Sequence, residues 1–207
     1  MKQQFLCVLA CVLAVSGGRL MADDAGPSKP STETATFAGG CFWCMQPPYD
    51  KLPGVISTTV GYTGGTKPNP TYDEVCSGTT GHAEAVQIVF DPAQSTYARL
   101  LDVFWQNIDP TTKNQQFADR GTQYRTAVFY HSDEQRRLAE ASQAQWAASG
   151  KFGGRPLVTE IVPASTFYPA EAYHQQYYKT CPLQYKMYRA GSGREGFLEK
   201  VWGRRQH

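Results

Sequence analysis

Five segments of the chain have the hydrophobic pattern of β-strands. They are rich in β-branched and aromatic residues, and Val86, Ile88 and Phe90 alternate with other residues so that they share one face. The five segments are residues 34–38, 55–62, 84–90, 126–130 and 158–162. Their lengths are those of ordinary strands, and their composition predicts a β-sheet.

Two segments between these strands have helical patterns. Residues 95–108 place Leu101 and Trp105 four positions apart, on one side of a helix. Residues 132–149 open with Ser-Asp-Glu-Gln, which is a capping box, and stop before Gly150. Strands that alternate with helices of this length predict a mixed sheet with flanking helices, of the α+β or α/β class.

Two long connections have neither pattern. Residues 63–82 and 109–124 are rich in Gly, Pro, Asn and Thr. Loops of this length inside a compact domain are usually functional or disordered. Tyr72 and Tyr124 lie in these connections and favour ordered loops, so we expect long functional loops beside the sheet.

The first 22 residues differ from the rest of the chain. Lys2 precedes an apolar run over residues 5–15, and small residues follow. This order is typical of a secretory signal peptide. Residues 23–32 are polar and aperiodic and predict a flexible lead-in, which leaves residues 33–207 as one domain. The apolar run is too short to span a bilayer, so we expect a periplasmic or secreted protein without a membrane anchor.

Charge and cysteine content change when the leader is removed. The whole chain has 20 basic and 18 acidic residues, and the leader holds two basic residues and no acidic one, which leaves 18 of each. A neutral chain gives no reason to expect nucleic acid or an anionic membrane as a partner. Four cysteines remain, which is an even number but too few for a disulfide scaffold. They are Cys41, Cys44, Cys76 and Cys181.

The sequence Gly-Gly-Cys-Phe-Trp-Cys-Met over residues 39–45 places two cysteines around an aromatic pair. A glycine doublet after a strand predicts a tight turn into a helix, with Cys41 in the first turn. There the helix dipole lowers the pKa of a thiol, so Cys41 is a candidate nucleophile. Cys44 follows one helical turn later, with the Cα atoms roughly 5 Å apart, within reach of a disulfide. Pro47 and Pro48 lack backbone N–H groups, so we expect the helix to kink or break there.

The cysteine pair has three other interpretations. It could be half of a zinc site, but no second such pair exists, and His82, His174 or Cys181 would have to complete it. It could be a structural disulfide, although so short a loop constrains the unfolded chain little. It could also be a thioredoxin-like exchange site, for which this spacing alone is a weak signature. The two histidines are expected to make structural hydrogen bonds, and Cys76 to be a small buried hydrophobe.

Six motifs in order extend the pattern over most of the domain. They are GGCFW at residues 39–43, GYTGG at 61–65, PNPTYDEVCSG at 68–78, GHAEAV at 81–86, GTQYR at 121–125 and YPAEAYHQQY at 168–177. In this order the motifs resemble those of the A-type peptide methionine sulfoxide reductases. The resemblance implies a ferredoxin-like α+β fold and repair of oxidised methionine, free or in proteins, as the S epimer of the sulfoxide.

The resemblance also implies roles for particular residues. Cys41 corresponds to the nucleophile and Glu84 to the acid. Tyr72 and Tyr124 correspond to the hydroxyl groups that bind the sulfoxide oxygen. Phe42 and Trp43 correspond to the wall against the substrate methyl group, and Asp119 to a further acidic residue of the same pocket.

Elementary chemistry requires the same groups. The sulfur of a sulfoxide is electrophilic only if its oxygen is protonated or hydrogen-bonded while the thiolate attacks. Glu84 can give a proton near neutral pH only if its pKa is raised, and burial beside Phe42 and Trp43 would do so. The same apolar pocket disfavours the Cys41 thiolate, so we expect the thiol and Glu84 to titrate as a coupled pair.

The resemblance further implies that a second thiol closes a disulfide with the Cys41 sulfenic acid. Cys44 is our first choice because it is close in sequence, and Cys181 is the alternative or a second step. The expected enzyme uses no metal or other cofactor and takes electrons from an external thioredoxin-like dithiol. We expect a monomer.

Overall fold

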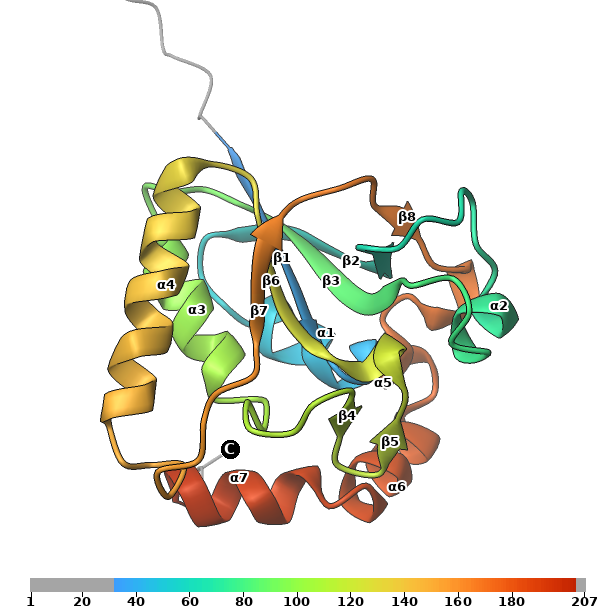
Figure 1. Ribbon diagram of the computed structural model, residues 1–207. Helices are drawn as coiled ribbons and strands as arrows, with labels where there is room; N and C mark the ends of the chain where they lie inside the picture. Colours follow the sequence, from blue (N-terminus) through green and yellow to red (C-terminus); the bar gives the residue numbers. More distant parts are fainter. Residues whose placement is uncertain (1–31, 204–207) are drawn as a thin grey trace, which may run out of the picture.

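A six-stranded sheet organises the fold (Figure 1). The computed structural model describes residues 32–203, so the predicted signal peptide and residues 23–31 of the predicted lead-in lie outside the described residues. The strands follow the order β7-β6-β1-β3-β2-β8. They are β1 (Glu33–Gly39), β2 (Val55–Thr63), β3 (Ala83–Phe90), β6 (Thr126–Tyr130), β7 (Glu160–Pro163) and β8 (Tyr168–Pro169). Only β6 and β7 pair in parallel, so the sheet is mixed, as predicted.

Four of these strands and two helices form a ferredoxin-like unit. The chain runs through β1, α1 (Phe42–Asp50), β2, β3, α3 (Tyr97–Trp105) and β6. In space the four strands lie in the order β6-β1-β3-β2, with every neighbouring pair antiparallel. This is the β-α-β-β-α-β arrangement of ferredoxin-like folds. The predicted α+β class is therefore confirmed.

The main core lies between the sheet and three helices. Helices α1, α3 and α4 (Asp133–Ala148) cover one face, and Figure 1 shows α3 and α4 side by side. Alternate residues of β1 and β3 point into this layer, among them Phe37, Val86, Ile88 and Phe90. Glu84 has the same parity on β3 as Val86 and Ile88, so the strand directs its carboxyl toward the helical layer rather than toward water.

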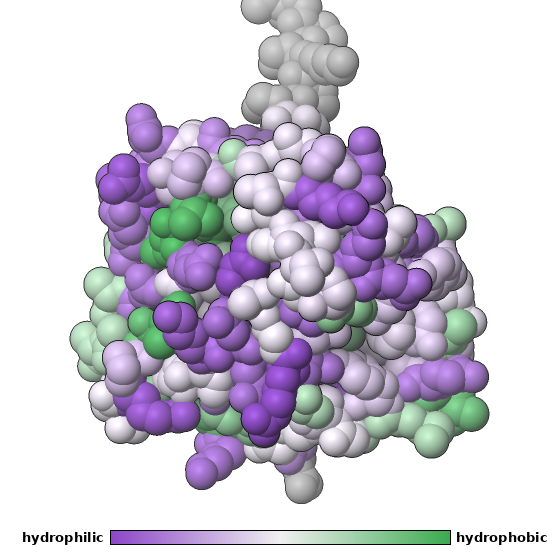
Figure 2. Space-filling view, turned by 45° about the vertical axis from the view of Figure 1, so that its right-hand side comes forward, coloured by the Kyte–Doolittle hydropathy of each residue, from purple (hydrophilic) through white to green (hydrophobic). Residues whose placement is uncertain are grey.

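Short elements and loops cover the other face of the sheet. Small side chains of Ala38, Ala85 and Ala127 form a second cluster there, against Val162 and Phe167. The surface in Figure 2 shows hydrophobic residues in small patches between hydrophilic ones. Within residues 32–203 no helix is both long enough and apolar enough to cross a bilayer.

The two long connections are ordered, as expected, and contain short elements. The first holds helix α2 (Tyr72–Cys76), and the second holds the strand pair β4 (Gln115–Gln116) and β5 (Asp119–Arg120) and the turn η1 (Thr122–Tyr124). After β8 the chain forms η2 (Ala172–His174), α5 (Tyr177–Thr180), α6 (Pro182–Gly191) and α7 (Arg194–Trp202). The sequence analysis predicted no helix after residue 149, and α6 and α7 prove to border the candidate site.

The first helix was expected to kink or break at its two prolines, and it does not break there. Helix α1 contains Pro47 and Pro48 and continues to Asp50. Without an N–H at Pro48, the carbonyl oxygen of Cys44 lacks its helical donor. That oxygen instead accepts a hydrogen bond from Nη1 of Arg189 on α6, at 3.4 Å. A side chain from a distant segment thus takes over one of the missing backbone donors.

Candidate active site

Cys41 lies where β1 turns into α1. Gly40 has φ +76°, a conformation that favours glycine, and a Cβ atom there would lie 2.4 Å from Cβ of Gln116. Cys41 is the N-cap of α1 and makes no capping hydrogen bond with its side chain. Its side chain is 6% exposed. The turn therefore places the thiol just ahead of the helix, pointing into the protein.

A cavity of about 60 Å³ lies against this thiol. A water molecule occupies about 30 Å³ in the liquid, so the space holds a methyl group and one oxygen rather than a large ligand. Eight residues line the cavity: Cys41, Phe42, Trp43, Tyr72, Glu84, Asp119, Tyr124 and Tyr188. Seven of them were predicted from the sequence, and the structure brings these seven together from segments far apart in the chain.

Glu84 is the buried acid of the cavity. Its side chain is 2% exposed, and Oε2 accepts a hydrogen bond from the backbone N–H of Phe42 at 3.0 Å. Burial raises the pKa of Glu84 to about 8, because the loss of water outweighs the stabilising N–H and the negative Asp119 adds to the rise. The carboxyl group therefore holds a proton near neutral pH, as the sequence analysis required.

The two predicted tyrosines supply neutral hydroxyl groups. Tyr72 begins α2, where its backbone N–H donates to Oε1 of Glu171 at 2.9 Å, and Tyr124 ends η1. Burial raises the pKa of both phenols, and the charge of Glu84 raises both further. Both hydroxyls also hydrogen-bond Cys76, which is half-buried, so the expectation of a simple buried hydrophobe is wrong for Cys76.

Trp43 forms an aromatic wall held by two neighbours. Its indole Nε1 donates to Nδ1 of the fully buried His174 at 3.0 Å, and its ring stacks on Tyr177 with centroids 3.9 Å apart. His82 accepts from the backbone N–H of Gly65 at 3.0 Å. Both histidines thus make the structural hydrogen bonds that were predicted.

Tyr188 is the cavity residue that the sequence analysis missed. It comes from α6, donates a hydrogen bond to Oδ2 of Asp119 and hydrogen-bonds the thiol of Cys41. Burial raises the pKa of Asp119, while Tyr188 and Arg194 act in the opposite direction. The helical spacing of Tyr185, Tyr188 and Arg189 along one side of a helix was the available signal.

The two thiols of the motif have opposite environments. The backbone N–H of Cys44 donates to the carbonyl oxygen of Cys41 at 3.0 Å, and the two side chains hydrogen-bond each other. Burial raises the pKa of Cys41 well above its usual value, and Cys44 and Glu84 add to the rise. Of the two opposing effects expected on the Cys41 pKa, burial therefore outweighs the helix dipole in the free protein, where the first helical N–H binds Glu84.

Cys44 and Cys181 do not line the cavity. Cys44 is fully buried behind Cys41, whereas Cys181 lies half-buried at the junction of α5 and α6. Cys181 hydrogen-bonds Tyr177, the residue that stacks on Trp43. All four cysteines of the described part are free thiols. In the same part, no group of three or more His, Cys, Asp and Glu side chains is placed to hold a metal, so the zinc interpretation finds no ligand set there.

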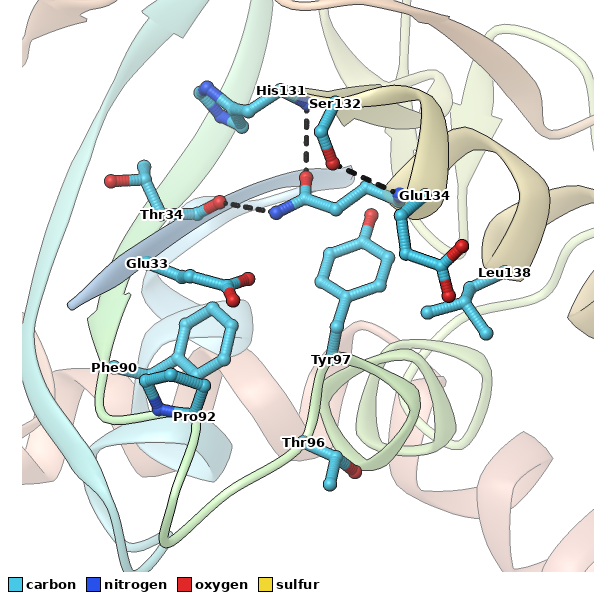
Figure 3. Close-up of a pocket in the computed structure, with 11 residues that line it drawn as sticks. Glu33, Thr34, Phe90, Pro92, Thr96, Tyr97, His131, Ser132, Glu134 and Leu138 are labelled. Carbon is cyan, nitrogen blue, oxygen red and sulfur yellow. Dashed lines mark hydrogen bonds between the residues drawn. The ribbon is translucent and has the colours of Figure 1, made fainter. Parts of the chain in front are cut away.

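A larger pocket lies elsewhere and has different chemistry. It has a volume of about 470 Å³ and lies at the start of β1 and α4, whereas Cys41 follows the end of β1 (Figure 3). Figure 3 shows Phe90, Pro92 and Tyr97 around its apolar floor. No cysteine lines this pocket. Thiol chemistry therefore belongs to the small cavity.

A buried cysteine, a protonated carboxyl and neutral phenols around a small cavity are the groups that a thiol-dependent oxidoreductase acting on a small polarised oxygen requires. The family model described as "Peptide methionine sulfoxide reductase" matches residues 33–206. This chain belongs to that family, and its match is to the A type. It is an oxidoreductase that reduces methionine sulfoxide with thiols and serves protein repair.

The similarity extends over most of each relative. Peptide methionine sulfoxide reductase MsrA of Bacillus licheniformis is 58% identical over 84% of this chain and 95% of that protein. The protein of the same name from Bacillus subtilis is 58% identical over 83% and 96%. Among solved structures, reduced Mxr1 from Saccharomyces cerevisiae has a TM-score of 0.69 and 35% identity over 76% of this chain and 89% of that one. Methionine sulfoxide reductase A of Corynebacterium diphtheriae has a TM-score of 0.67 and 38% identity over 75% and 78%.

Proposed function

We propose that this chain reduces the S epimer of methionine sulfoxide by transferring its oxygen to Cys41. The observation that carries the proposal is the meeting of Cys41 with a buried, protonated Glu84 in one cavity of about 60 Å³. An unpaired acid in an apolar site keeps its proton near neutral pH and can give it to an oxygen on which negative charge develops.

The substrate methyl group would lie against Phe42 and Trp43, which are fixed by packing and by His174. The sulfoxide oxygen would then face Glu84 and the hydroxyl groups of Tyr72 and Tyr124. The sulfur of Cys41 attacks the sulfoxide sulfur while Glu84 protonates the oxygen. The oxygen finishes on Cys41 as a sulfenic acid, and methionine leaves.

Cys44 is the proposed resolving thiol. It is next to Cys41 in space, and the two thiols already hydrogen-bond, so a disulfide requires only local movement. Cys181 is the alternative, or a second step that carries the disulfide toward the surface, because only Tyr177 separates it from the aromatic wall of the cavity.

The electron donor is proposed to be a thioredoxin-like dithiol, with no metal or other cofactor. A structure of Mxr1 from Saccharomyces cerevisiae in complex with Trx2 supports this, with a TM-score of 0.50 and 27% identity over 73% of this chain. A thiol–disulfide exchange with such a donor would return Cys41 and Cys44 to thiols.

The cellular setting is a proposal from the sequence alone. A signal peptide over residues 1–22 would deliver a monomeric enzyme to the periplasm or the exterior. The balanced charge of the remaining chain supports neither nucleic acid nor a membrane surface as a partner.

One experiment separates this function from its rivals. The reduced protein is incubated with S-methionine sulfoxide and no external reductant, and methionine and free thiols are counted. The proposal predicts one methionine for every two thiols lost. Reduction of a test disulfide without release of methionine would indicate general thiol–disulfide exchange. Inertness together with tightly held zinc would indicate a binding domain.

A further inference from the structure

Two guanidinium groups from the C-terminal helices lie beside the resolving thiol. Arg189 of α6 donates from Nη1 to the carbonyl oxygen of Cys44 at 3.4 Å, and its positive charge favours the Cys44 thiolate. Its Nε forms an ion pair with Glu195 at 3.1 Å. Arg189 thus binds the backbone of Cys44 and has one carboxylate partner.

Arg194, the first residue of α7, is buried without such a partner. Its side chain is 1% exposed, and its guanidinium donates to the carbonyl oxygens of Gly39, at 3.0 Å, and Asn107, and to Sδ of Met45, at 3.6 Å. Phe117 lies 4.6 Å from its central carbon. All of these partners are neutral, and within residues 32–203 Arg194 forms no ion pair. A buried cation is costly without an anion nearby, and the charge of Arg194 acts on two acidic groups, the carboxyl of Asp119 and the thiol of Cys44.

Of these two groups, Asp119 also accepts a hydrogen bond from Tyr188, whereas the charges of both arginines act on Cys44. Arg189 and Arg194 are positive, whereas Glu84 on β3 holds a proton near neutral pH and burial raises the pKa of Tyr185 on α6 to about 12. The hydrogen bond from Cys41, followed by the charges of Arg194 and Arg189, lowers the pKa of Cys44 to about 6 despite its burial. The negative charge of the cysteine pair therefore resides on Cys44 and not on Cys41.

We propose that Arg189 and Arg194 form a cationic pair that holds Cys44 as a thiolate and so accelerates closure of the Cys41–Cys44 disulfide. The inference rests on the proposed function, because Cys41 must first carry the oxygen. The Cys44 anion attacks the sulfur of the sulfenic acid, the S–S bond forms and the S–O bond of Cys41 breaks. The proton that the Cys41 thiol loses on attack returns to Glu84, and the leaving hydroxide now takes this proton and becomes water. Cys44 is oxidised and the sulfenic sulfur is reduced, so no further oxidant is needed.

A single-turnover experiment tests this role. Wild-type protein, Arg189→Gln and Arg194→Gln are reduced, mixed with S-methionine sulfoxide and quenched at intervals between about pH 6 and pH 9. Methionine and the Cys41–Cys44 disulfide are measured in the same samples. Loss of one positive charge should raise the Cys44 pKa by about one unit. A shift of the Cys44 pKa from about 6 to about 7 should lower the disulfide-forming rate, relative to the methionine-forming rate, about twofold near pH 7 and about fivefold near pH 6, and the rate should recover at higher pH.

Three controls make the outcome decisive. Arg136→Gln on the exposed side of α4 removes the same charge far from the site and should leave the ratio of the two rates unchanged. Arg189→Lys keeps the charge and should restore much of the ratio. If Arg194→Gln does not fold, Arg189→Gln decides, because Arg189 is partly exposed.

The pKa of Cys44 can also be read directly. The ultraviolet absorbance of the thiolate is followed against pH in the Cys41→Ser variant. The absorbance of Cys41→Ser/Cys44→Ser, measured in the same way, is subtracted. Adding Arg189→Gln should move this titration upward by about one unit. Wild-type rates and an unmoved titration in the arginine variants would overturn the inference. Absence of methionine from the wild-type protein would instead contradict the proposed function.

Discussion

At the scale of single residues, Glu84 differs from the exposed carboxylates of the same chain because it keeps its proton near neutral pH. Its parity on β3 directs it under the helical layer, and the N–H of Phe42 then holds one oxygen in place. Burial costs the ionised form its water, which one N–H does not replace. The acid strength that catalysis needs is thus a consequence of where the strand places the residue.

Replacing Glu84 with glutamine should remove the proton and keep the shape. We expect kcat/KM for methionine sulfoxide to fall about 10²–10³-fold, the usual contribution of a general acid. The wild-type rate should decline as pH rises through about 8, since Glu84 then loses its proton, and the variant should lack this decline. Glu140→Gln on exposed α4 is the matched control. An alkaline decline that persists in Glu84→Gln would contradict the assignment.

The same substitution should change the pH dependence of stability. The folded-state pKa of about 8 lies above the ordinary value of 4.5, so folding retains a proton that the unfolded chain releases between these values. The stability that this retained proton contributes to the wild-type protein is therefore lost as pH rises from about 4.5 to about 8. Across this pH range, the free energy of unfolding of Glu84→Gln should therefore rise relative to that of wild type by on the order of 4 kcal/mol. Denaturant unfolding at several pH values measures the difference, and a constant difference would refute a raised pKa.

Motifs predicted most of the site at this scale, and environments explain what they missed. The family resemblance that the motifs carry implied that Cys41, Glu84 and the two loop tyrosines share one pocket, and the structure places them around one cavity. The sequence analysis named two opposing effects on the Cys41 pKa, the helix dipole and the apolar pocket, and only the structure shows that burial is the larger. Tyr188 was missed because no predicted helix brought it back to the site.

At the scale of elements, the turn between β1 and α1 is closely packed against the β4–β5 segment. Gly40 combines positive φ with a close approach to Gln116, and the strand before it carries the carbonyl group of Gly39 that binds Arg194. A side chain at Gly40 would therefore disturb both the backbone conformation and the packing of the β4–β5 segment.

Gly40→Ala and Gly150→Ala together separate these two effects. Both glycines have φ near +75°, at +76° and +72°, but a Cβ at Gly150 would meet nothing within 4 Å. We expect about 1 kcal/mol of destabilisation for Gly150→Ala from the backbone alone. Gly40→Ala should cost on the order of 3 kcal/mol because overpacking adds to it. Thermal or denaturant unfolding measures both, and equal losses would show that the close approach is easily relieved.

Long, strongly patterned elements were predictable, and short or irregular ones were not. Five strands and helices α3 and α4 agree with the sequence analysis because their apolar side chains repeat with period two or near 3.6. Strands β4, β5 and β8 have two residues each, too few to show a period. Helix α1 survives its two prolines because Arg189 satisfies a freed carbonyl group, a contact that local sequence does not reveal.

At the scale of the whole molecule, the C-terminal helices complete a site that the ferredoxin-like unit begins. The unit supplies the nucleophile and the acid from β1, α1 and β3, and the two loops add tyrosines. Helices α6 and α7 then bring Tyr188, Arg189 and Arg194 against the end of β1 (Figure 1). The hydrophobic pattern predicted a mixed sheet with flanking helices, and the family resemblance implied the ferredoxin-like unit. The polar contacts through which α6 and α7 complete the site have no periodic signature in the sequence.

The packing of α6 and α7 against the site favours Cys44 over Cys181 as the resolving thiol. After one turnover without reductant, we expect a Cys41–Cys44 disulfide in wild type and in Cys181→Ser, closing at similar rates. Cys44→Ser should instead accumulate the sulfenic acid, and it should form any disulfide at least about tenfold more slowly than the wild-type protein. Mass spectrometry of quenched digests reads the bond directly. A Cys41–Cys181 bond that closes at full rate in Cys44→Ser would reverse the assignment.

The most direct measurement is the fate of the substrate oxygen in Cys44→Ser/Cys181→Ser, where neither candidate thiol can resolve the intermediate. The protein is mixed with S-methionine sulfoxide and a reagent that captures sulfenic acids, and methionine and labelled peptide are counted. We predict one labelled Cys41 for each methionine released. The triple variant that also carries Cys41→Ser should release no methionine. Release of methionine without a label on Cys41, or undiminished turnover in Cys41→Ser, would contradict oxygen transfer to this sulfur.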